Sequence, residues 1–342
     1  MAVSSLSAIS SALSLIFDHK LARQWNRMAR TISILEAKPG TGKSVNWDVS
    51  TSGQTAATHV EGLDIQSTEL LIDAKLPMIL PWGLYRNAFG LTEHQLEAAL
   101  QSKESAEQLM QLLEESVYES VAALASKLNA DLFGGNGASN ALNGLDHSLL
   151  ATGTYAGQDV GTITVLQSNI DANGTVPRAL TIELMDKMEG SIFTKSGMRP
   201  DFIVTTPKVF TKYKSLFEPI RRLVGDAPNR YDTSVSDDQV YFQGIPVIRD
   251  KDCPSGKMYF LNRNSLHMAY MPPANFGDAV SFVVKMAMGS NADGDEQEFG
   301  IPFRIQSLAK TGDSVKFFIR TAAQVVVRRP NACGVISYII ES

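Results

Sequence analysis

The segment from Ala37 to Ser44 is the part of this sequence closest to a recognised chemical motif. It reads Ala-Lys-Pro-Gly-Thr-Gly-Lys-Ser and differs from the phosphate-binding pattern G-x-x-x-x-G-K-[ST] only by an alanine in place of the first glycine. Such a loop binds phosphate because its backbone N–H groups surround the anion and its Lys-Ser pair opens a helix. We expect a strand over residues 32–35, but residues 45–49 also alternate like a strand, so the required helix is missing. A Gly/Pro hairpin tip is therefore favoured, and a nucleotide-dependent enzyme is the lesser alternative.

The other reactive side chains do not stand at spacings that build a site. The five histidines contain no i,i+4 pair and no partner at metal-ligand spacing: His19, His59, His94, His147 and His267. Residues 291–296 lack the register of a calcium loop and are interpreted as a solvated acidic turn. No nucleophile motif occurs, and the arginine pairs at 221–222 and 328–329 are interpreted as surface pairs. The sequence therefore predicts no enzyme, no catalytic residue, no metal site and no cofactor.

Composition is that of a folded globular chain. The 342 residues are 44% hydrophobic and 20% charged, and 31 Lys and Arg against 36 Asp and Glu leave a formal net charge of −5. This composition excludes a disordered chain, and the charge balance excludes a protein that binds the nucleic-acid phosphate backbone over its whole surface. Cys253 and Cys333 build no disulfide framework. Because no apolar run approaches the roughly 18 residues of a membrane span and no basic residue precedes Lys20, we expect a cytoplasmic chain without membrane contact.

The first eighty residues predict elements that need partners outside their own segment. Residues 4–30 have the apolar stripe of an amphipathic helical arm. Residues 31–80 alternate with period two, and the polar stretches 38–43 and 50–55 predict long β-hairpins with solvated tips. A segment with so few large apolar side chains cannot bury much of its own surface, so we expect it to lie against something else.

The next segment predicts a single long helix. Thr92 to Gln95 match a capping box, apolar residues recur at helical spacing as far as Leu132, and Gly134-Gly135 end the pattern. About forty residues at 1.5 Å each make a rod of roughly 60 Å, which exceeds the diameter of a compact domain. The sequence therefore predicts an elongated subunit.

The remainder alternates strands and shorter helices in an α+β manner. Helices are predicted near 180–192 and from Pro207, with Thr206 as the cap. Strands are predicted at 161–167, 201–205, 240–248, 257–261, 315–327 and 335–340.

The order of these segments resembles the major capsid protein of tailed bacteriophages, the Hong Kong 97 fold. Four motifs carry the resemblance. Trp47 lies in an outgoing strand and Val60-Glu61-Gly62 in the return of an extended loop that leads to a strand at 69–74. The long helix closes on Asp131-Leu132-Phe133-Gly134-Gly135-Asn136-Gly137, with Asn143-Gly144-Leu145 after it. The other two motifs are Phe242-Gln243-Gly244-Ile245-Pro246-Val247-Ile248, followed by a hairpin, and the closing strand Val325-Val326-Val327-Arg328-Arg329-Pro330-Asn331-Ala332.

The resemblance implies a division of the chain. It has an N-terminal arm at 1–30, an extended loop with flanking strands at 31–80, a peripheral domain with the spine helix at 81–150, an axial domain at 151–285 and a return to the peripheral domain at 286–342. It implies a shell subunit that forms pentamers and hexamers around packaged double-stranded DNA, which it does not recognise by sequence. Portal, scaffold and decoration or cement proteins would be its partners, and the virion capsid, assembled in the host cytoplasm, its location. A cellular encapsulin-like nanocompartment shell is the alternative of the same fold.

Six residues are candidates for assembly contacts or loop geometry. Trp47, Glu61 and Gly62 belong to the extended loop, although burial of Trp47 in its own chain is an equal alternative. Gly134, Gly135 and Gly144 stand where the long helix turns, and we expect them to serve positive φ or close backbone approach.

Overall fold

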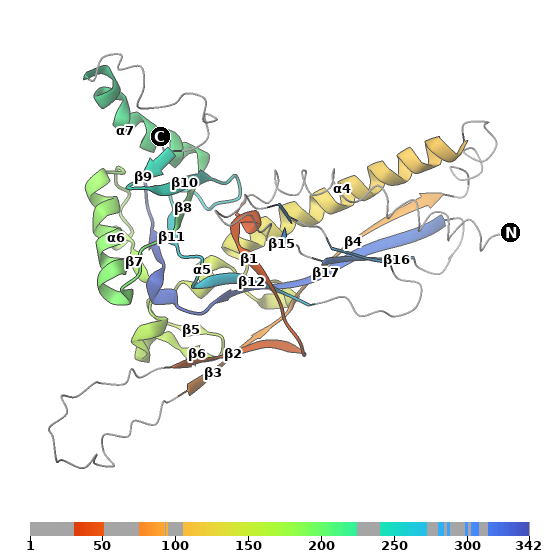
Figure 1. The fold of residues 1–342 in the computed structure, drawn as a ribbon, viewed down its shortest axis with the longest axis horizontal. Coiled ribbons are helices and arrows are strands. Elements are labelled where there is room, and N and C mark those ends of the chain that lie inside the picture. The colour runs from red at the N-terminus through yellow and green to blue at the C-terminus, as the bar shows by residue number, and fades with distance from the viewer. Residues whose placement is uncertain are drawn as a thin grey trace, which may run out of the picture.

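The computed structural model describes residues 31–50, 75–92, 94, 105–223, 240–271, 280–283, 286–287, 298–299, 302–307 and 314–341. These residues form an α+β fold with two six-stranded sheets, a separate two-stranded ribbon and one long helix (Figure 1). In the view of Figure 1, the long helix and the first sheet extend to the right, the second sheet with its helices stands at the left, and the ribbon lies below. No helix within these ranges is long and apolar enough to cross a membrane.

The long helix α4 (Ser105–Gly134) packs on the first sheet. That sheet has the order β1 (Glu36–Pro39), β12 (Leu266–Tyr270), β17 (Ser314–Val327), β16 (Pro302–Ser307) and β13 (Val280–Val283), and β4 (Gly83–Thr92) also pairs with β17. The antiparallel β4–β17 register runs from Thr92 opposite Ser314 to Gly83 opposite Ala323. The helix forms here because its buried residues recur at three and four positions: Val117, Val121, Leu124, Leu128 and Leu132.

The second sheet is mixed and carries two helices. Its order is β7 (Asn169–Asp171), β18 (Gly334–Ile336), β11 (Met258–Leu261), β8 (Phe202–Thr205), β10 (Ile245–Arg249) and β9 (Val240–Phe242). Helix α6 (Ile182–Ser196) packs at the β7–β18 side and α7 (Pro207–Leu223) at β10. Capping residues fix where these helices begin and end. The Thr181 Oγ1 accepts from Leu184 N at the start of α6, and the Thr206 Oγ1 accepts from Val209 N at the start of α7. Gly197 ends α6 with a left-handed backbone conformation.

The ribbon consists of β2 (Ser44–Ser50) and β3 (Lys75–Pro81), and short elements complete the described fold. These are α5 (Leu145–Ser148), the hairpin β5 (Thr154–Tyr155) and β6 (Gln158–Asp159), the pair β14 (Met286–Ala287) and β15 (Glu298–Phe299), and six 3-10 turns: Ile32–Ile34, Ala138–Asn140, Val160–Thr162, Thr164–Leu166, Asn173–Thr175 and Pro330–Ala332.

Two main hydrophobic clusters hold these elements together. The larger one joins α4, the first sheet, the base of the ribbon and one face of the second sheet. The other lies between the opposite face of the second sheet and helices α6 and α7. Alternation assigns the faces: Tyr259 of β11 belongs to the first cluster, and its neighbours Met258 and Phe260 belong to the second. The second sheet is thus covered on both faces, as its nearly continuous burial requires.

Most predicted elements are confirmed. The long helix ends at Gly134, helices begin at Ile182 and Pro207, and strands occupy 202–205, 258–261 and 314–327. The expected strand at 240–248 is the hairpin β9–β10, and the last strand is shorter than expected, 334–336. The helix was expected to begin at Thr92, but Thr92 is the last residue of β4. Residues 95–104, the arm at 1–30 and the expected strand at 69–74 lie outside the described residues.

Three predictions were wrong. Residues 32–34 form a 3-10 turn in place of a strand, because Ile32 and Leu35 are both buried, three positions apart. Residues 161–167 belong to two further 3-10 turns, the first of which is capped by the Asp159 carboxylate. Residues 38–43 are not a hairpin tip, since β1 pairs with β12 and β2 pairs with β3.

Strand β4 was not predicted from the sequence. Glycines interrupt its alternation of apolar and polar residues, and pairing with the long strand β17 stabilises it.

Candidate assembly surfaces

The ribbon β2–β3 leaves the body of the molecule with one side uncovered. Its register runs from Ser44 opposite Pro81 to Ser50 opposite Lys75. Met78 and Leu80 are buried towards the core, whereas the side chain of Ile79 between them is 54% exposed. The turn after β5 supports the base, where Ile79 N donates to the Ala156 carbonyl over 3.1 Å. No third strand pairs with the ribbon among the described residues.

Trp47 lies in β2 opposite Met78 and is half-buried by its own chain. Its ring stands 6.2 Å from that of Tyr155, and it packs against the large cluster and against a small one around Trp82. The indole Nε1 is buried without a hydrogen-bond acceptor among the described atoms. Much of this side chain therefore serves intrachain packing. Glu61 and Gly62, the other two candidates of the extended loop, lie outside the described residues.

Trp82 organises the segment that was compared with a phosphate-binding loop. Its Nε1 donates to the Gly42 carbonyl over 2.9 Å, and its ring lies so close to Gly40 that an added Cβ would stand 2.7 Å from Cη2. Ser44 then begins strand β2, so the Lys-Ser pair opens no helix. The segment is a connection between two sheets, held by a buried tryptophan. The nucleotide-binding reading has no structural support here.

The turn after α4 depends on two of the three candidate glycines. A Cβ on Gly135 would lie 2.3 Å from the Leu142 carbonyl oxygen, and one on Gly144 would lie 2.5 Å from that of Asp131. Gly144 N also donates to the Gly135 carbonyl over 2.7 Å. The expectation for Gly134 was wrong: nothing lies within 4 Å of its added Cβ, and its φ is not positive. The space is needed one residue later, where the chain folds back on the helix.

The Tyr85 hydroxyl joins this turn to the first sheet. It donates to the Asp131 carboxylate over 2.8 Å and accepts from Leu142 N over 2.9 Å. Burial, with the Asp131 carboxylate, raises the pKa of Tyr85 above its ordinary value, so the hydroxyl keeps its proton. The turn is thus fixed to β4 as well as to α4.

A buried carboxylate joins the start of the described chain to both main bodies. Asp250, 3% exposed, follows β10 and accepts from the backbone N and Oγ1 of Thr31 and, over 2.8 Å, from Asn129 Nδ2 of α4. It also accepts from Asp252 N over 2.9 Å. Because four donors converge on one buried carboxylate, the direction in which the chain enters at Thr31 is coupled to helix α4 and to the second sheet. Sequence reasoning missed this cluster, since its members are up to 219 positions apart.

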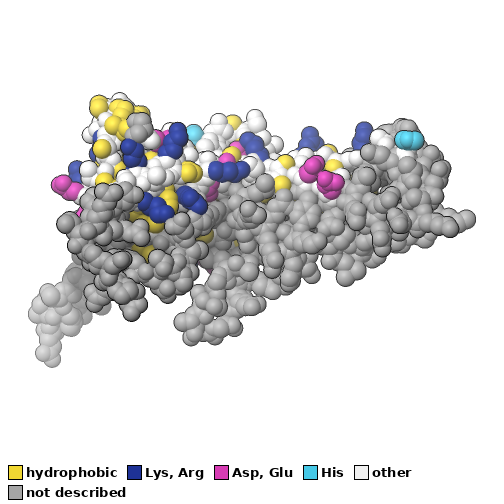
Figure 2. Space-filling model, turned by 90° about the horizontal axis from the view of Figure 1, so that it is seen from above, with side chains coloured by type: hydrophobic (Ala, Val, Ile, Leu, Met, Phe, Trp, Pro, Cys, Tyr) yellow, Lys and Arg dark blue, Asp and Glu magenta, His cyan; other side chains and the backbone are white. Residues whose placement is uncertain are grey.

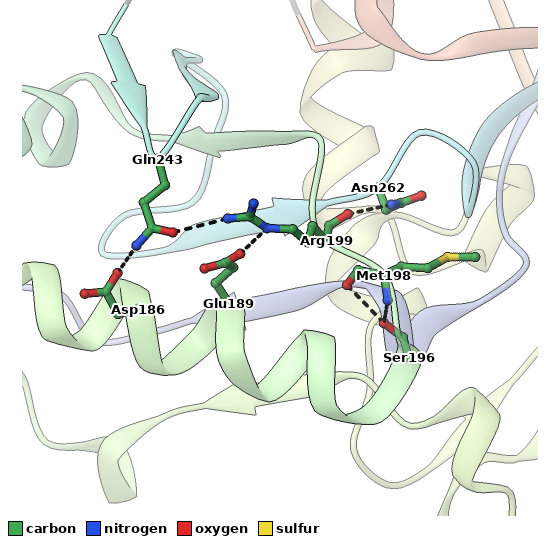
Figure 3. Close-up of polar contacts among 7 residues, drawn as sticks. All are labelled: Asp186, Glu189, Ser196, Met198, Arg199, Gln243 and Asn262. Carbon is green, nitrogen blue, oxygen red and sulfur yellow. Dashed lines mark hydrogen bonds and ion pairs between the residues drawn. The ribbon is translucent and has the colours of Figure 1, made fainter.

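The tip of the β9–β10 hairpin is tied to α6 by exposed polar groups (Figure 3). Arg199 Nε pairs with Glu189 over 2.5 Å, and its Nη2 donates to Gln243 Oε1 over 3.2 Å. The Gln243 amide donates in turn to Asp186 over 2.6 Å. Gln243 and Gly244 both have positive φ, 49° and 84°, as a tight two-residue hairpin requires. Side-chain contacts thus hold a non-glycine residue in a disfavoured conformation.

Hydrophobic side chains also remain exposed on the body formed by the second sheet. Figure 2 shows such side chains gathered at the end of the molecule that carries this body, with Lys and Arg spread along the rest of the described face. The largest exposed fractions on this body are those of Val176, Phe193 and Tyr241, at 60, 54 and 52%. Where such side chains form a contiguous patch, the surface is typical of one that meets a partner.

Neither a metal cluster nor any other reactive constellation emerges from these contacts. No group of three His, Cys, Asp or Glu residues that could hold a metal occurs in the described ranges. Burial raises the pKa of the Cys253 and Cys333 thiols, both of which are free, so neither is an activated nucleophile. The features described above are therefore candidates for contact surfaces: the exposed side of the ribbon and the exposed apolar side chains of the second sheet's body.

A comparison with protein families finds one match over most of the chain. The family model described as SU10 major capsid protein matches residues 92–339. No curated protein matches the sequence.

Solved shell structures share the fold at low sequence identity. The capsid asymmetric unit of cyanophage A-1(L) is 18% identical over 92% of both chains, with a TM-score of 0.65. The SrpI encapsulin of Synechococcus elongatus PCC 7942 is 11% identical over 92% of this chain and 88% of its own, with a TM-score of 0.56. The capsid of the empty GTA particle is 11% identical over 92% and 90%, with a TM-score of 0.53. These likenesses show a common fold.

Proposed function

The chain belongs to the SU10 major capsid protein family, and from this premise we propose that its copies form pentamers and hexamers that close an icosahedral shell around double-stranded DNA. The observation that carries the proposal is the uncovered ribbon. A two-stranded ribbon is marginally stable in water, and this one exposes Ile79 while its own chain provides no further strand among the described residues. A neighbouring copy would provide that cover, which makes the ribbon a contact between subunits.

The candidate residues take different parts in this proposal. Trp47 would anchor the base of the ribbon on its own chain, and Glu61 and Gly62 would belong to the part that reaches a neighbour. Gly135 and Gly144 would keep the end of α4 in one orientation relative to β4. Many individually modest contacts of this kind, repeated around a closed shell, would add up to a stable particle.

The proposed role is structural and not catalytic. The shell would enclose DNA without reading its sequence, which is compatible with a net charge of −5. Portal, scaffold and decoration proteins would complete the particle, assembly would take place in the host cytoplasm, and the virion capsid would be the final location.

Expression of the chain followed by sedimentation and cryo-electron microscopy tests the proposal. Closed shells or rings of five and six subunits are the expected result. A compact monomer at all protein and salt concentrations would contradict it.

The likeness to the SrpI encapsulin supports a second candidate, a nanocompartment shell that encloses protein cargo. The family match favours the capsid. The contents of particles purified from their natural source decide: double-stranded DNA agrees with the capsid, and an enzyme cargo without DNA agrees with the nanocompartment.

A further inference from the structure

Two carboxylates of the Asp250 cluster share one amide group. Asp250 is 3% exposed, and the half-buried Asp252 follows it by two residues. Asn129 Nδ2 lies 2.8 Å from Asp250 Oδ1 and 2.8 Å from Asp252 Oδ2. Lys251, between the two, turns to α4 instead, where its Nζ lies 3.3 Å from Ser126 Oγ. The ion pairs of the described residues involve other carboxylates: Glu36, Asp131, Asp146, Asp171, Glu189 and Glu341.

The groups that reach the Asp250 carboxylate are all uncharged. They are the backbone N and hydroxyl of Thr31, the amide of Asn129 and the backbone N of Asp252. Such hydrogen bonds stabilise one carboxylate, but they leave the repulsion between two neighbouring carboxylates in place. Buried charges in proteins are paired with an opposite charge or coordinate a metal ion. A cation between Asp250 and Asp252 would supply the missing positive charge.

The Asn129 side chain provides an independent observation at the same place. It is fully buried and aimed between the two carboxylates, yet its Oδ1 has no hydrogen-bond partner among the described atoms. Half a turn of the amide group exchanges its oxygen with its nitrogen and brings Oδ1 to the position 2.8 Å from each carboxylate. Neighbouring oxygens around an octahedral Mg²⁺ are about 3 Å apart. In that orientation the cluster presents three oxygens at the spacing of cation ligands.

We propose that Asp250, Asp252 and Asn129 bind a divalent cation that prefers oxygen ligands, Ca²⁺ or Mg²⁺, and that water completes its coordination on the half-exposed side of Asp252. The set is not three His, Cys, Asp or Glu side chains, because its third oxygen belongs to an amide. Asp250 also holds Thr31, and Asn129 belongs to α4. The cation would therefore fasten the start of the described chain, the long helix and the second sheet to one another within a single copy.

Denaturant unfolding of the full-length chain, first freed of metal with EDTA, tests for the cation. The chain is unfolded in CaCl2, in MgCl2 and in NaCl of the same ionic strength. A cation that binds only the folded chain lowers the unfolding equilibrium constant about a hundredfold when its free concentration is about a hundred times Kd. We expect such a decrease with CaCl2 or MgCl2 and not with NaCl, and isothermal titration calorimetry gives the Kd. An equal effect of NaCl would show general screening of charge and overturn the inference.

Asp252→Asn decides whether the cation lies in this cluster. The substitution removes one charge and retains an oxygen that can accept from Asn129, so the chain should fold, and its affinity for the cation should fall about tenfold or more. The matched control is Asp159→Asn, the same charge change at an exposed turn where the carboxylate accepts from Gly161 N, and it should leave the Kd unchanged. Equal affinities in the two variants would place the cation elsewhere and overturn the inference.

Asn129→Asp should change the response in the opposite direction. It puts a third carboxylate in place of the amide, so in EDTA the variant should unfold at a lower denaturant concentration than the unmodified chain. Its affinity for Ca²⁺ should rise about tenfold, because affinity increases with the charge of the ligands. A loss of stability that neither CaCl2 nor MgCl2 restores would show that the cluster works through hydrogen bonds alone, and would overturn the inference.

Discussion

The two sheets of this molecule differ in how the charged residues on their strands are arranged. Around the second sheet, charged groups find partners in the same chain: Arg178 with Asp171 at 2.8 Å, Arg199 with Glu189, and Lys257 with Asp146 at 2.7 Å. Burial alone would raise the pKa of Asp171, but the hydrogen bond and charge of Arg178 outweigh it and hold that pKa below its ordinary value. On the first sheet, Lys38 pairs with Glu36 within β1, whereas β4, β16 and β17 align Arg86, Arg304 and Arg320 and contain no carboxylate.

This difference separates a surface on which charged groups form ion pairs within the chain from one on which like charges stand side by side. On the body of the second sheet, these ion pairs stand beside exposed apolar side chains such as Tyr241. On the first sheet, Arg86, Arg320 and Arg304 stand opposite one another across three neighbouring strands. The Asp250 cluster is a polar contact between the two bodies, in addition to the larger hydrophobic cluster, and its removal is the first test.

Replacement of Asp250 by alanine should have the largest effect. The change removes the acceptor of the Thr31 N–H and hydroxyl and leaves the Asn129 amide with Asp252 only, and we expect a loss of about 3 kcal/mol or more in the free energy of unfolding. Denaturant unfolding at a fixed protein concentration measures it. The matched control is Asp159→Ala, an exposed carboxylate that accepts from Gly161 N, with an expected loss of about 1 kcal/mol. Equal losses of unfolding free energy in the two variants would contradict the proposed importance of the Asp250 cluster.

The burial of His267 in the first sheet should produce a pH dependence. Burial, and then the charges of Arg328 and Lys38, lower the pKa of His267 to about 4. Glu36 stands opposite in register on β1. Because the unfolded histidine titrates near 6.5, the unfolded state binds more protons between pH 6.5 and 4. Stability from this group is therefore complete above pH 6.5 and decreases as the pH falls towards 4, by about 2–3 kcal/mol.

The pH dependence is assigned by comparing two histidine substitutions. His267→Gln should flatten the curve of unfolding free energy between pH 6.5 and 4, whereas His147→Gln, at an exposed position, should leave it unchanged. An unchanged slope in the His267 variant would show that other groups cause the acid sensitivity.

The smallest effect is expected in the exposed network of the second sheet. Arg199→Ala removes the contacts with Glu189 and Gln243, but solvent screens them, so we expect a loss below about 1 kcal/mol in thermal unfolding. Arg199→Lys retains the charge and loses the two-point geometry, and it should fall between alanine and the unmodified chain. A loss of several kcal/mol would show that this network, and not the hydrophobic cluster beneath it, holds the hairpin.

Predictions from sequence succeeded where a signal and its structural effect are neighbours. Thr206 before Pro207 begins a helix, and Gly134-Gly135 end one, because caps and glycines act within a single turn. Failures occurred where alternation fits more than one structure: Ile32 and Ile34 alternate as in a strand, yet burial of Ile32 and Leu35 makes a 3-10 turn. Of the candidate residues named through the resemblance, Gly135 and Gly144 have no space for a Cβ, and an assembly role for Trp47 stays a prediction. The roles of Trp82 and Asp250 were not predicted, because they depend on contacts from distant parts of the chain.

Local sequence alone was sufficient for the α+β class, the long helix, the cap of α7 and the absence of a helix after the Lys-Ser pair, since each follows from short-range sterics and hydrogen bonding. Tertiary structure decided which strands pair, which glycine lacks space for a side chain, and that Arg86 and Arg320 face each other. Strand register joins residues more than two hundred positions apart, and no local pattern contains that distance. The charge pattern that distinguishes the two sheets therefore became visible only when the chain was folded.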